Sequence, residues 1–366
     1  MDSPITEPGE HRLAFSSQWT AWLGLVLGNL LLTIITLGIY RFWARTRERR
    51  YLWAATRLGD EALEYTGRGQ ELLIGAILAF FVLILPLVVV SIGAGFAKGL
   101  GLDAVALGAQ LSIYAVLLWL VYFATWRAMR YRLSRTRWSG IRGAMEGSAA
   151  AYALLAIKML GLQLITLGFA GPYASARLWN ALWSDARLGT LPVVAQAQWR
   201  PLMRIYLTSW GVGLVGLIVV GVVQWQLIGD HVSFEIGAPP KAPPPPAAAL
   251  QSIGLSLVWL LAFALIMLRY YAAQWQALIG GLSLDGLQFR FTATAGDWLR
   301  YWLGNAALVL FTLGIGGLML PWRHWRFMAS HIAADGAIDV DRLQQTRVDA
   351  PIFGEGLADA LDIGAI

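Results

Sequence analysis

Three polar side chains within long apolar stretches are the first candidates for a binding site. Lys158 lies near the middle of the apolar segment at residues 150–169, and Asn29 and Asn305 lie in apolar segments near the two ends of the chain. A charge at the centre of a bilayer costs about 2.5–3.5 kcal/mol on insertion scales and usually faces protein or water. Lys158 is therefore either a site for an anionic ligand or a side chain that reaches the membrane surface from a shallow helix. The two asparagines either bond one another across a symmetric interface or bridge local backbone.

Arginines that follow the apolar segments form a second group of candidates. Guanidinium groups bind phosphate through paired hydrogen bonds, and tryptophan rings favour the headgroup layer of a membrane. The chain has 18 tryptophans, several of them beside these arginines. We therefore expect contacts with anionic lipid headgroups along one membrane surface. The candidate residues are Arg41, Arg45, Arg47, Arg177, Arg323 and Arg326.

Most catalytic and cofactor chemistry finds no support in the sequence. The absence of cysteine excludes disulfides, thiolate metal sites, iron–sulfur clusters and cysteine nucleophiles. The four histidines form no HExxH motif, and neither a nucleotide-binding glycine loop nor a Gly-x-Ser-x-Gly motif is present. No carboxylate lies deep in an apolar segment, which weakens proton-coupled transport. We therefore expect a protein that is not an enzyme and has no cofactor or metal site.

The elements that must position these residues are membrane helices. The chain is 57% hydrophobic and 14% charged, whereas globular proteins carry about 25% charge. A hydrocarbon core of about 30 Å needs about 20 apolar residues of helix, and backbone groups in lipid must bond within the segment. Seven segments approach or reach that length. They are residues 22–40, 72–96, 106–126, 150–169, 206–227, 250–268 and 299–320.

The sequence also repeats itself. Phe15, Trp22, Asn29 and Thr36 recur with the same spacing as Phe291, Trp298, Asn305 and Thr312. A third copy contains Thr166, and weaker copies begin at Tyr65 and Trp199. Such periodicity predicts stacked or symmetric structural units. We predict one membrane domain at residues 1–347, followed by an acidic tail at 348–366. Its five pseudo-repeats are residues 15–64, 65–144, 145–198, 199–290 and 291–347.

The predicted fold class is an all-α polytopic integral membrane protein with internal pseudo-repeats. Four of the seven segments belong to the two long units and are expected to be transmembrane helices. The other three end at Thr-Leu-Gly, where glycine permits a helix to end or bend. These three either span the membrane or re-enter and return to the starting side. Aromatic lead-ins such as LAFSSQW predict short interfacial strands or turns before the helices.

The distribution of positive charge predicts the orientation. Arginine is dense between residues 41 and 68 and between 127 and 142, whereas the proline-rich loop at 229–249 has only Lys241. The positive-inside rule then places the basic regions and the C-terminus in the cytoplasm and the proline-rich loop outside. Simple alternation of seven spans cannot satisfy this pattern, which favours re-entrant Thr-Leu-Gly segments. The net charge of +6 is explained in the same way, so we expect no nucleic acid partner.

At TLGIYRFWARTRERRYLW the sequence resembles the YjgN family of bacterial inner-membrane proteins, which is catalogued as a domain of unknown function. The shared pattern is an aromatic lead-in, an asparagine in the apolar run, Thr-Leu-Gly-Ile-Tyr, a tryptophan and clustered arginines ending in tyrosine. The resemblance covers nearly the whole chain, including the ending GEGLADALD. It implies a multi-pass protein of the bacterial inner membrane and supplies no catalytic residue, substrate or cofactor. It also hints at a membrane metalloprotease as a partner.

Two functions are compatible with these features. The first is a non-catalytic membrane organiser that binds anionic lipid or a membrane-protein partner, as the arginine and tryptophan clusters suggest. The alternative is a transporter or permease for a small anionic solute or lipid headgroup, because internal repeats and interrupted apolar segments are typical of transporters. The candidate residues for an intramembrane transport site are Lys158, Asn29 and Asn305, with an anionic small molecule or lipid headgroup as the ligand expected for Lys158.

Overall fold

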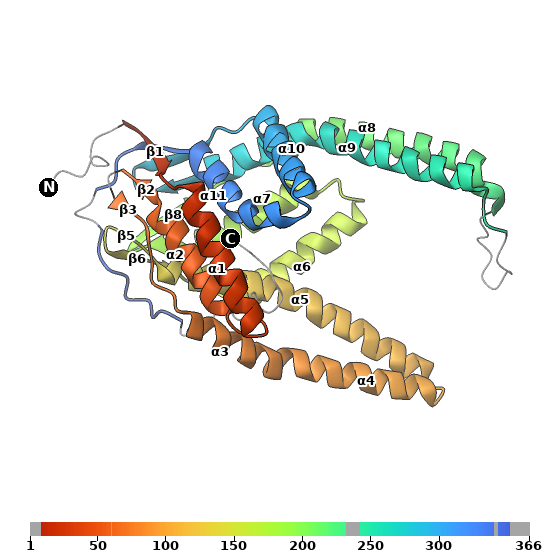
Figure 1. Cartoon of the computed structure of the whole chain (residues 1–366), viewed down its shortest axis with the longest axis horizontal. Helices are drawn as coiled ribbons and strands as arrows, with labels where there is room; N and C mark the ends of the chain where they lie inside the picture. The colour runs from red at the N-terminus through yellow and green to blue at the C-terminus, as the bar shows by residue number, and fades with distance from the viewer. Residues whose placement is uncertain (1–8, 60, 232–241, 340–342, 352–366) are drawn as a thin grey trace.

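The computed structural model describes residues 9–59, 61–231, 242–339 and 343–351. Along this part of the chain one order of elements, strand–helix–helix–strand, occurs five times. Three of the units carry short helices and two carry long ones, in alternation. Figure 1 shows the strands gathered at one end of the molecule and the long helices extending from it.

The short units are the first, third and fifth. The first contains β1 (Gly9–Phe15), α1 (Trp19–Ile35), α2 (Arg41–Ala54) and β2 (Thr56–Leu58). The third contains β6 (Ile141–Met145), α6 (Ala149–Ile165), α7 (Gly171–Ser184) and β7 (Ala186–Leu188). The fifth contains β10 (Leu287–Phe291), α10 (Ala295–Phe311), the 3₁₀ turn η3 (Ile315–Met319), α11 (Leu320–His331) and β11 (Ile332–Gly336).

The long units are the second and fourth. The second contains β3 (Glu61–Ala62), β4 (Glu64–Tyr65), α3 (Gly69–Ala79), the π-helical turn η1 (Phe80–Ile84), α4 (Leu85–Gly99), α5 (Asp103–Arg135) and β5 (Thr136–Trp138). The fourth contains β8 (Leu191–Ala195), α8 (Arg200–Ile228), the short 3₁₀ turn η2 (Gly229–His231), α9 (Pro246–Gly280) and β9 (Leu282–Leu284). Residues 232–241 of the predicted proline-rich loop lie outside the described part of the chain, and α9 already begins at Pro246.

All eleven strands form one antiparallel sheet in the order β3-β2-β1-β11-β10-β9-β8-β7-β6-β5-β4. The two edge strands, β3 and β4, are separated along the chain only by Leu63. The backbone N–H of Leu63 donates to Thr56 at 2.9 Å, and that of Thr66 donates to Arg135 at 2.8 Å. One extended segment therefore pairs with β2 on one side and β5 on the other, and the sheet forms a nearly closed barrel.

Apolar side chains from around the ring fill the barrel. The most buried are Trp138, Leu284, Leu287 and Ala334, and the C-terminal segment adds Ile338 and Leu343. Burial of these side chains supplies the main driving force for closing a ring of such short strands. The N–H of Thr190 donates to the carbonyl oxygen of Gln344 at 3.0 Å, so the C-terminal segment also lies against the strand turns.

The prediction of an all-α fold is wrong, because the helices stand on a strand barrel. The lead-in strands were predicted only as short interfacial strands or turns, and three-residue strands such as β2 carry too few alternating residues to show a period of two. The ring also depends on pairing between β1 and β11, where Gly9 lies opposite Gly336. Such distant pairing leaves no local signal in the sequence.

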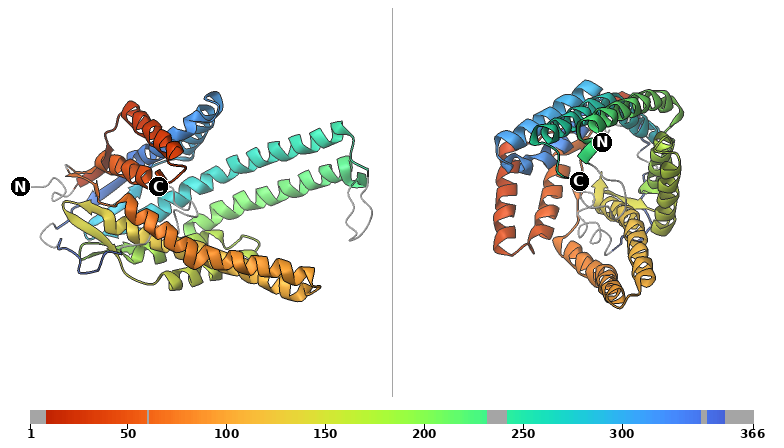
Figure 2. Two further views of the ribbon diagram at one scale, coloured as in Figure 1. Left: turned by 60° about the horizontal axis from the view of Figure 1, so that its bottom comes forward. Right: turned by 90° about the vertical axis from the view of Figure 1, so that its right-hand side faces the viewer.

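Helices occupy every second connection of the ring, so all of them leave the barrel at one end. Figure 2 shows the helical hairpins arranged around the barrel axis in chain order, with the α4–α5 and α8–α9 hairpins extending farthest. Within the described residues, four continuous helical stretches are long and apolar enough to cross a membrane: Gly69–Gly99, Asp103–Arg135, Arg200–Ile228 and Pro246–Gly280. These match the four predicted transmembrane segments.

The three Thr-Leu-Gly segments are hairpins that begin and end at the barrel. In the first unit β1 leads into α1, α2 returns, and β2 then pairs with β1. The third unit returns between β6 and β7, which are also paired, and the fifth between β10 and β11. The outgoing helices α1, α6 and α10 have 17 residues each, or about 25 Å. Each of these hairpins therefore begins and ends at the barrel; whether its helices span the membrane or re-enter it stays a prediction.

Candidate functional site: a basic pocket between α10 and α11

Asn29 and Asn305 each lie beside an arginine of the returning helix in their own hairpin. Asn29 is buried and donates to a backbone carbonyl of α2 (3.3 Å) and to Glu48 (3.0 Å). Its amide oxygen accepts a bond from Arg47 at 3.3 Å. Asn305 accepts a bond from Nε of Arg323 at 2.6 Å. The asparagines thus bridge local groups, and the alternative in which they bond one another is wrong.

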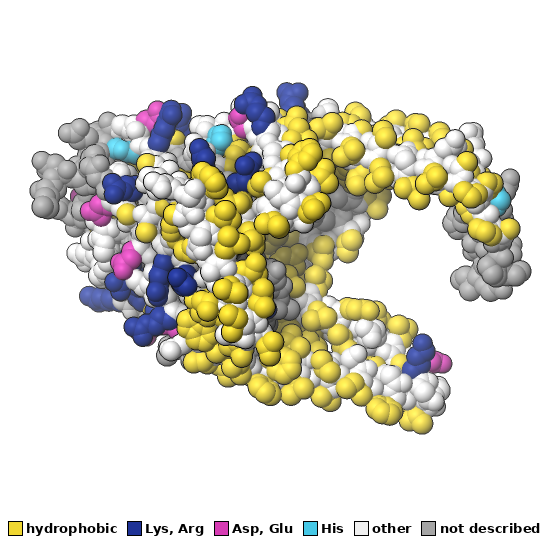
Figure 3. All heavy atoms as spheres, in the orientation of Figure 1, with side chains coloured by type: hydrophobic (Ala, Val, Ile, Leu, Met, Phe, Trp, Pro, Cys, Tyr) yellow, Lys and Arg dark blue, Asp and Glu magenta, His cyan; other side chains and the backbone are white. Residues whose placement is uncertain are grey.

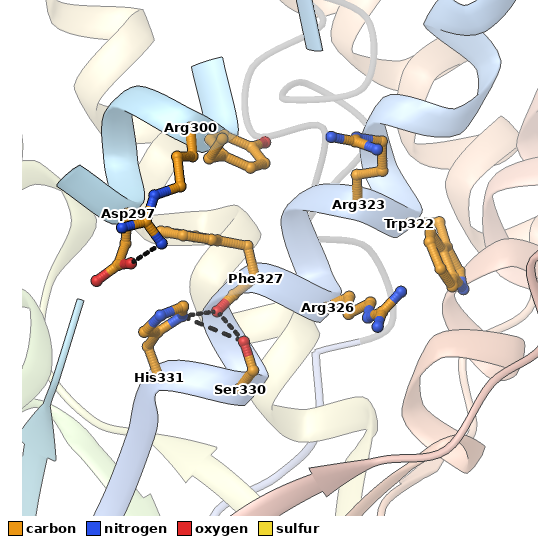
Figure 4. Close-up of a pocket in the computed structure, with 9 residues that line it drawn as sticks. Asp297, Arg300, Trp322, Arg323, Arg326, Phe327, Ser330 and His331 are labelled. Carbon is orange, nitrogen blue, oxygen red and sulfur yellow. Dashed lines mark hydrogen bonds and ion pairs between the residues drawn. The ribbon is translucent and has the colours of Figure 1, made fainter. Parts of the chain in front are cut away.

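Arg323 belongs to a pocket at the barrel end of the fifth hairpin. The pocket has a volume of about 340 Å³ and lies between the first turns of α10 and the outer face of α11. Figure 4 shows the side chains of both helices around it. Its lining is basic and aromatic. The lining residues are Asp297, Arg300, Tyr301, Trp322, Arg323, Arg326, Phe327, Ser330 and His331.

Local contacts hold each of the three arginines of this pocket. Arg300 lies 3.5 Å from the carboxylate of Asp297, and Arg323 is held by Asn305. The guanidinium of Arg326 lies over the ring of Trp322, 5.3 Å from its centroid. Because Arg326 is also exposed, its N–H groups remain accessible to solvent or a ligand.

The pocket carries a net positive charge. Hydrogen bonds from the side chain and backbone of Thr294 lower the pKa of Asp297, so this carboxyl is ionised at neutral pH. Three arginines against one aspartate leave two positive charges. Nearby, burial lowers the pKa of His324, which is therefore neutral at pH 7. Its Nδ1 forms a hydrogen bond with the hydroxyl of Tyr301 at 3.1 Å. The arrangement suits a phosphate or another compact anion.

A second pocket adjoins the first and shares Trp322 and Arg326 with it. Its volume is about 400 Å³, and the first unit supplies the other lining residues, which are Phe15, Ser17, Gln18, Trp19 and Thr20. The indole N–H of Trp322 donates to the hydroxyl of Ser17 at 2.9 Å, which ties the fifth unit to the first. Arg326 therefore stands between two pockets at the joint that closes the ring of repeats.

The other predicted arginines are spread over separate hairpins. Arg41 lies over the ring of Phe42 at 5.0 Å, and Arg47 donates to Tyr40 at 2.8 Å as well as to Asn29. Arg45 is half-buried on the same helix, α2. Arg177 is exposed on α7, the returning helix of the third unit. Of the predicted set, Arg323 and Arg326 meet in the pocket between α10 and α11.

Lys158 does not join this site. It is exposed on α6, in the third unit, and lines neither of the two pockets. Asn29 and Asn305 lie on α1 and α10, so the three candidate residues for an intramembrane site are on three different hairpins.

Sequence reasoning missed the α10 side of the pocket. Asp297, Arg300 and Tyr301 were counted within a lead-in and an apolar segment. Their spacing of three and four residues is the helical signal that could have placed them on one face. The matching signal on α11 is the spacing of Trp322, Arg323 and Arg326.

The fold is a strand barrel from one end of which apolar helical hairpins extend, with a basic, aromatic pocket at their junction. These features define the class of protein as a membrane protein. The model of a family described as bacterial protein of unknown function (DUF898) matches residues 10–360, and the chain belongs to this family. The family predicted from the Thr-Leu-Gly-Ile-Tyr motif is thereby confirmed.

The similar proteins are named as inner-membrane proteins. Inner membrane protein YjgN of Salmonella typhimurium is 23% identical over 386 residues, which cover 93% of this chain and 92% of that protein. Inner membrane protein YjgN of Escherichia coli strain K12 is 27% identical over 132 residues, or 36% of this chain and 30% of that protein. No solved structure matches the chain.

Proposed function

We propose that this protein is a non-catalytic organiser of the bacterial inner membrane, and that it binds the headgroup of an anionic phospholipid between α10 and α11. The observation that carries the proposal is the meeting of three arginines with the rings of Tyr301, Trp322 and Phe327 in an open pocket. This pocket lies where the apolar hairpin joins the barrel, which is the depth at which a lipid phosphate would be found. Arginine and tryptophan are the residue types that suit that layer.

The proposed topology has four transmembrane helices, with the barrel and the C-terminus in the cytoplasm. Arginines concentrate at the barrel end of the helices, for example Arg127 and Arg135 on α5 and Arg200 on α8. The far end of the α4–α5 hairpin carries Lys98 and Asp103. Figure 3 shows the same contrast, with basic side chains gathered at the barrel end and apolar side chains covering the arms. The positive-inside rule then places the barrel in the cytoplasm.

The first test measures lipid retention by the double variant Arg323→Gln, Arg326→Gln. A charge-assisted hydrogen bond contributes about 1.5–3 kcal/mol, so we expect at least about a tenfold loss of affinity for phosphatidylglycerol. Native mass spectrometry of the purified protein, titrated with phosphatidylglycerol or phosphatidylcholine, gives the measurement. Arg12→Gln is the matched control, because Arg12 is an exposed arginine of β1 that pairs with Glu10. Equal retention by the double variant and the control contradicts the proposal.

The transporter alternative stays a prediction; Lys158 lines neither of the two pockets beside α11. A membrane metalloprotease partner stays a prediction.

A further inference from the structure

The three short hairpins share one turn geometry at their tips. Leu37, Leu167 and Leu313 have φ angles of 52°, 50° and 50°, and the glycines that follow them have φ angles of 92°, 86° and 93°. Positive φ costs an ordinary L-residue about 1–2 kcal/mol and is usually left to glycine or asparagine. All three units nevertheless carry leucine at this position.

Threonine holds each of these turns in a fixed shape. The hydroxyl of Thr36 donates to the carbonyl four residues before it (2.8 Å) and accepts from the N–H four residues after it (2.9 Å). Thr166 makes the same two bonds at 2.7 and 3.1 Å. Thr312 makes both at 2.6 Å. Each leucine therefore lies in a turn that is fixed by two side-chain hydrogen bonds, and not at a frayed helix end.

The tip leucines are among the most exposed apolar side chains of the described chain. Leu37 and Leu313 are 94% exposed, and Leu167 is 73% exposed. Their neighbours are exposed and apolar as well, including Ile35, Ile165 and Phe311. Exposing a leucine at a strained backbone position is unfavourable in water. Asparagine at the same position would be both less strained and better hydrated.

We propose that these three tips are membrane anchors that insert into the acyl chains of the leaflet nearest the barrel without crossing to the other leaflet. Each outgoing helix reaches only about 25 Å from the barrel, part of it at headgroup depth, whereas the four candidate spans are 29–35 residues long. The three anchors and the four spans leave the same end of one barrel, so they enter the same membrane face. The choice of leaflet rests on the proposed topology, but insertion itself does not depend on the headgroup pocket.

The first tip is the shallowest of the three. Arg41 lies four residues after Leu37 and is exposed, whereas glycines occupy the comparable region after Leu167 and Leu313. The long side chain of Arg41 lets its charge remain at headgroup depth while the leucine enters lipid.

Single cysteines test the proposal directly, because the natural chain has none. Leu37→Cys, Leu167→Cys and Leu313→Cys are labelled with the environment-sensitive fluorophore NBD and reconstituted into vesicles of phosphatidylcholine and phosphatidylglycerol. Ser139→Cys is the matched control, since Ser139 also has a positive φ, of 52°, but lies in the β5–β6 turn at the far end of the barrel.

We expect lipids brominated along the acyl chain to quench the three tip labels at least twofold more than the Ser139 label, and aqueous iodide to show the reverse. The label at position 37 should be quenched best by the shallowest bromine. Iodide quenching of the tips that equals that of Ser139 overturns the proposal. The proposal is also overturned if impermeant maleimide labels a tip cysteine from the same side of the membrane from which it labels Leu102→Cys, between α4 and α5.

Thermal stability in the same vesicles gives an independent reading. Leu313→Asn relieves backbone strain, so it raises the unfolding midpoint if the tip is in water and lowers it if the tip is in lipid. Ser139→Asn is the control and raises the midpoint in either case. A rise for Leu313→Asn overturns the anchor, whatever the outcome for the headgroup pocket.

Discussion

Single residues at the barrel turns show how closely the C-terminal segment fits. Gly189 is buried, and a Cβ placed on it would overlap the carbonyl oxygen of Gln344. Gly140 occupies the β5–β6 turn with a φ of 72°, but a Cβ there would meet nothing within 4 Å. Substitutions at these two glycines distinguish two effects. One is backbone strain, and the other is displacement of the C-terminal segment, whose Leu343 is part of the core.

We therefore predict that Gly189→Ala destabilises the protein more than Gly140→Ala. The second change costs about 1–2 kcal/mol of backbone strain. The first adds displacement of Gln344 and loss of its bond from Thr190, about 1 kcal/mol or more. Chemical denaturation followed by tryptophan fluorescence gives both values. Equal losses in the two variants would show that the C-terminal segment does not rest on this turn.

Asp185 gives a prediction for pH dependence. It follows α7, and its carboxylate accepts a bond from the indole of Trp126 at 2.9 Å. Burial raises the pKa of Asp185; the bond from Trp126 opposes the rise, and the charge of Glu146 adds to it. The folded protein thus keeps this proton at pH values where the unfolded chain has lost it. The free energy of unfolding falls as pH rises from the ordinary to the raised pKa.

We expect Asp185→Asn to remove this fall, because asparagine still accepts the indole bond but does not titrate. Trp126→Phe removes the opposing bond and should extend the fall to higher pH. Unfolding midpoints measured between about pH 3 and pH 7 cover the window around the carboxyl pKa. An Asn variant that keeps the full slope of the natural protein would assign the effect to another group.

At the level of secondary-structure elements, the chain reverses direction at each Thr-Leu-Gly turn, and the next helix returns to the barrel. The sequence located the three turns, and its distribution of positive charge favoured re-entrant segments over spanning ones. In the structure each of the three hairpins returns to the barrel, where β1 pairs with β2, β6 with β7 and β10 with β11. The threonine hydroxyl bridges the helix end to the next helix in all three units.

Thr166→Val tests this bridge with little change of shape. The variant loses both bonds of the hydroxyl, to Leu162 and from Ala170, so we expect a loss of about 1–3 kcal/mol in stability. Thr208→Val is the control, because that hydroxyl lies on the exposed side of α8 and only donates to carbonyls of its own helix. Thermal unfolding in detergent measures the difference. A smaller loss of stability for Thr166→Val than for Thr208→Val would show that the threonine hydroxyl does not stabilise the turn.

At the scale of the whole molecule, the barrel places all strand turns at one end and all helices at the other. This polarity predicts that Ser139→Cys is cytoplasmic and that Leu102→Cys, between α4 and α5, is periplasmic. In intact cells an impermeant maleimide should label only the cysteine at 102, and that at 139 should react after permeabilisation. Labelling of position 139 in intact cells would invert the proposed topology.

The local features of this protein can be predicted from its amino-acid sequence. Four long apolar helices, the five-part repetition and the Thr-Leu-Gly turns depend on composition and short spacing, which neighbouring residues encode directly. Arg323 and Arg326 were likewise recognisable as candidates for headgroup contacts, because arginine and tryptophan alternate along one short stretch. The domain boundaries at residues 347 and 348 stay a prediction, and most of the acidic tail, residues 352–366, lies outside the described chain.

How these parts combine depends on contacts between segments that are far apart in the sequence. Closure of the barrel needs β1 against β11 and one segment shared between β2 and β5, and the free energy of such pairing comes from a core assembled around the whole ring. The partners of Asn29 and Asn305, and the meeting of Asp297 with Arg323 and Arg326, depend in the same way on helices folding back. Three-residue strands carry almost no pairing preference of their own, so their partners are chosen by the packing of the complete molecule.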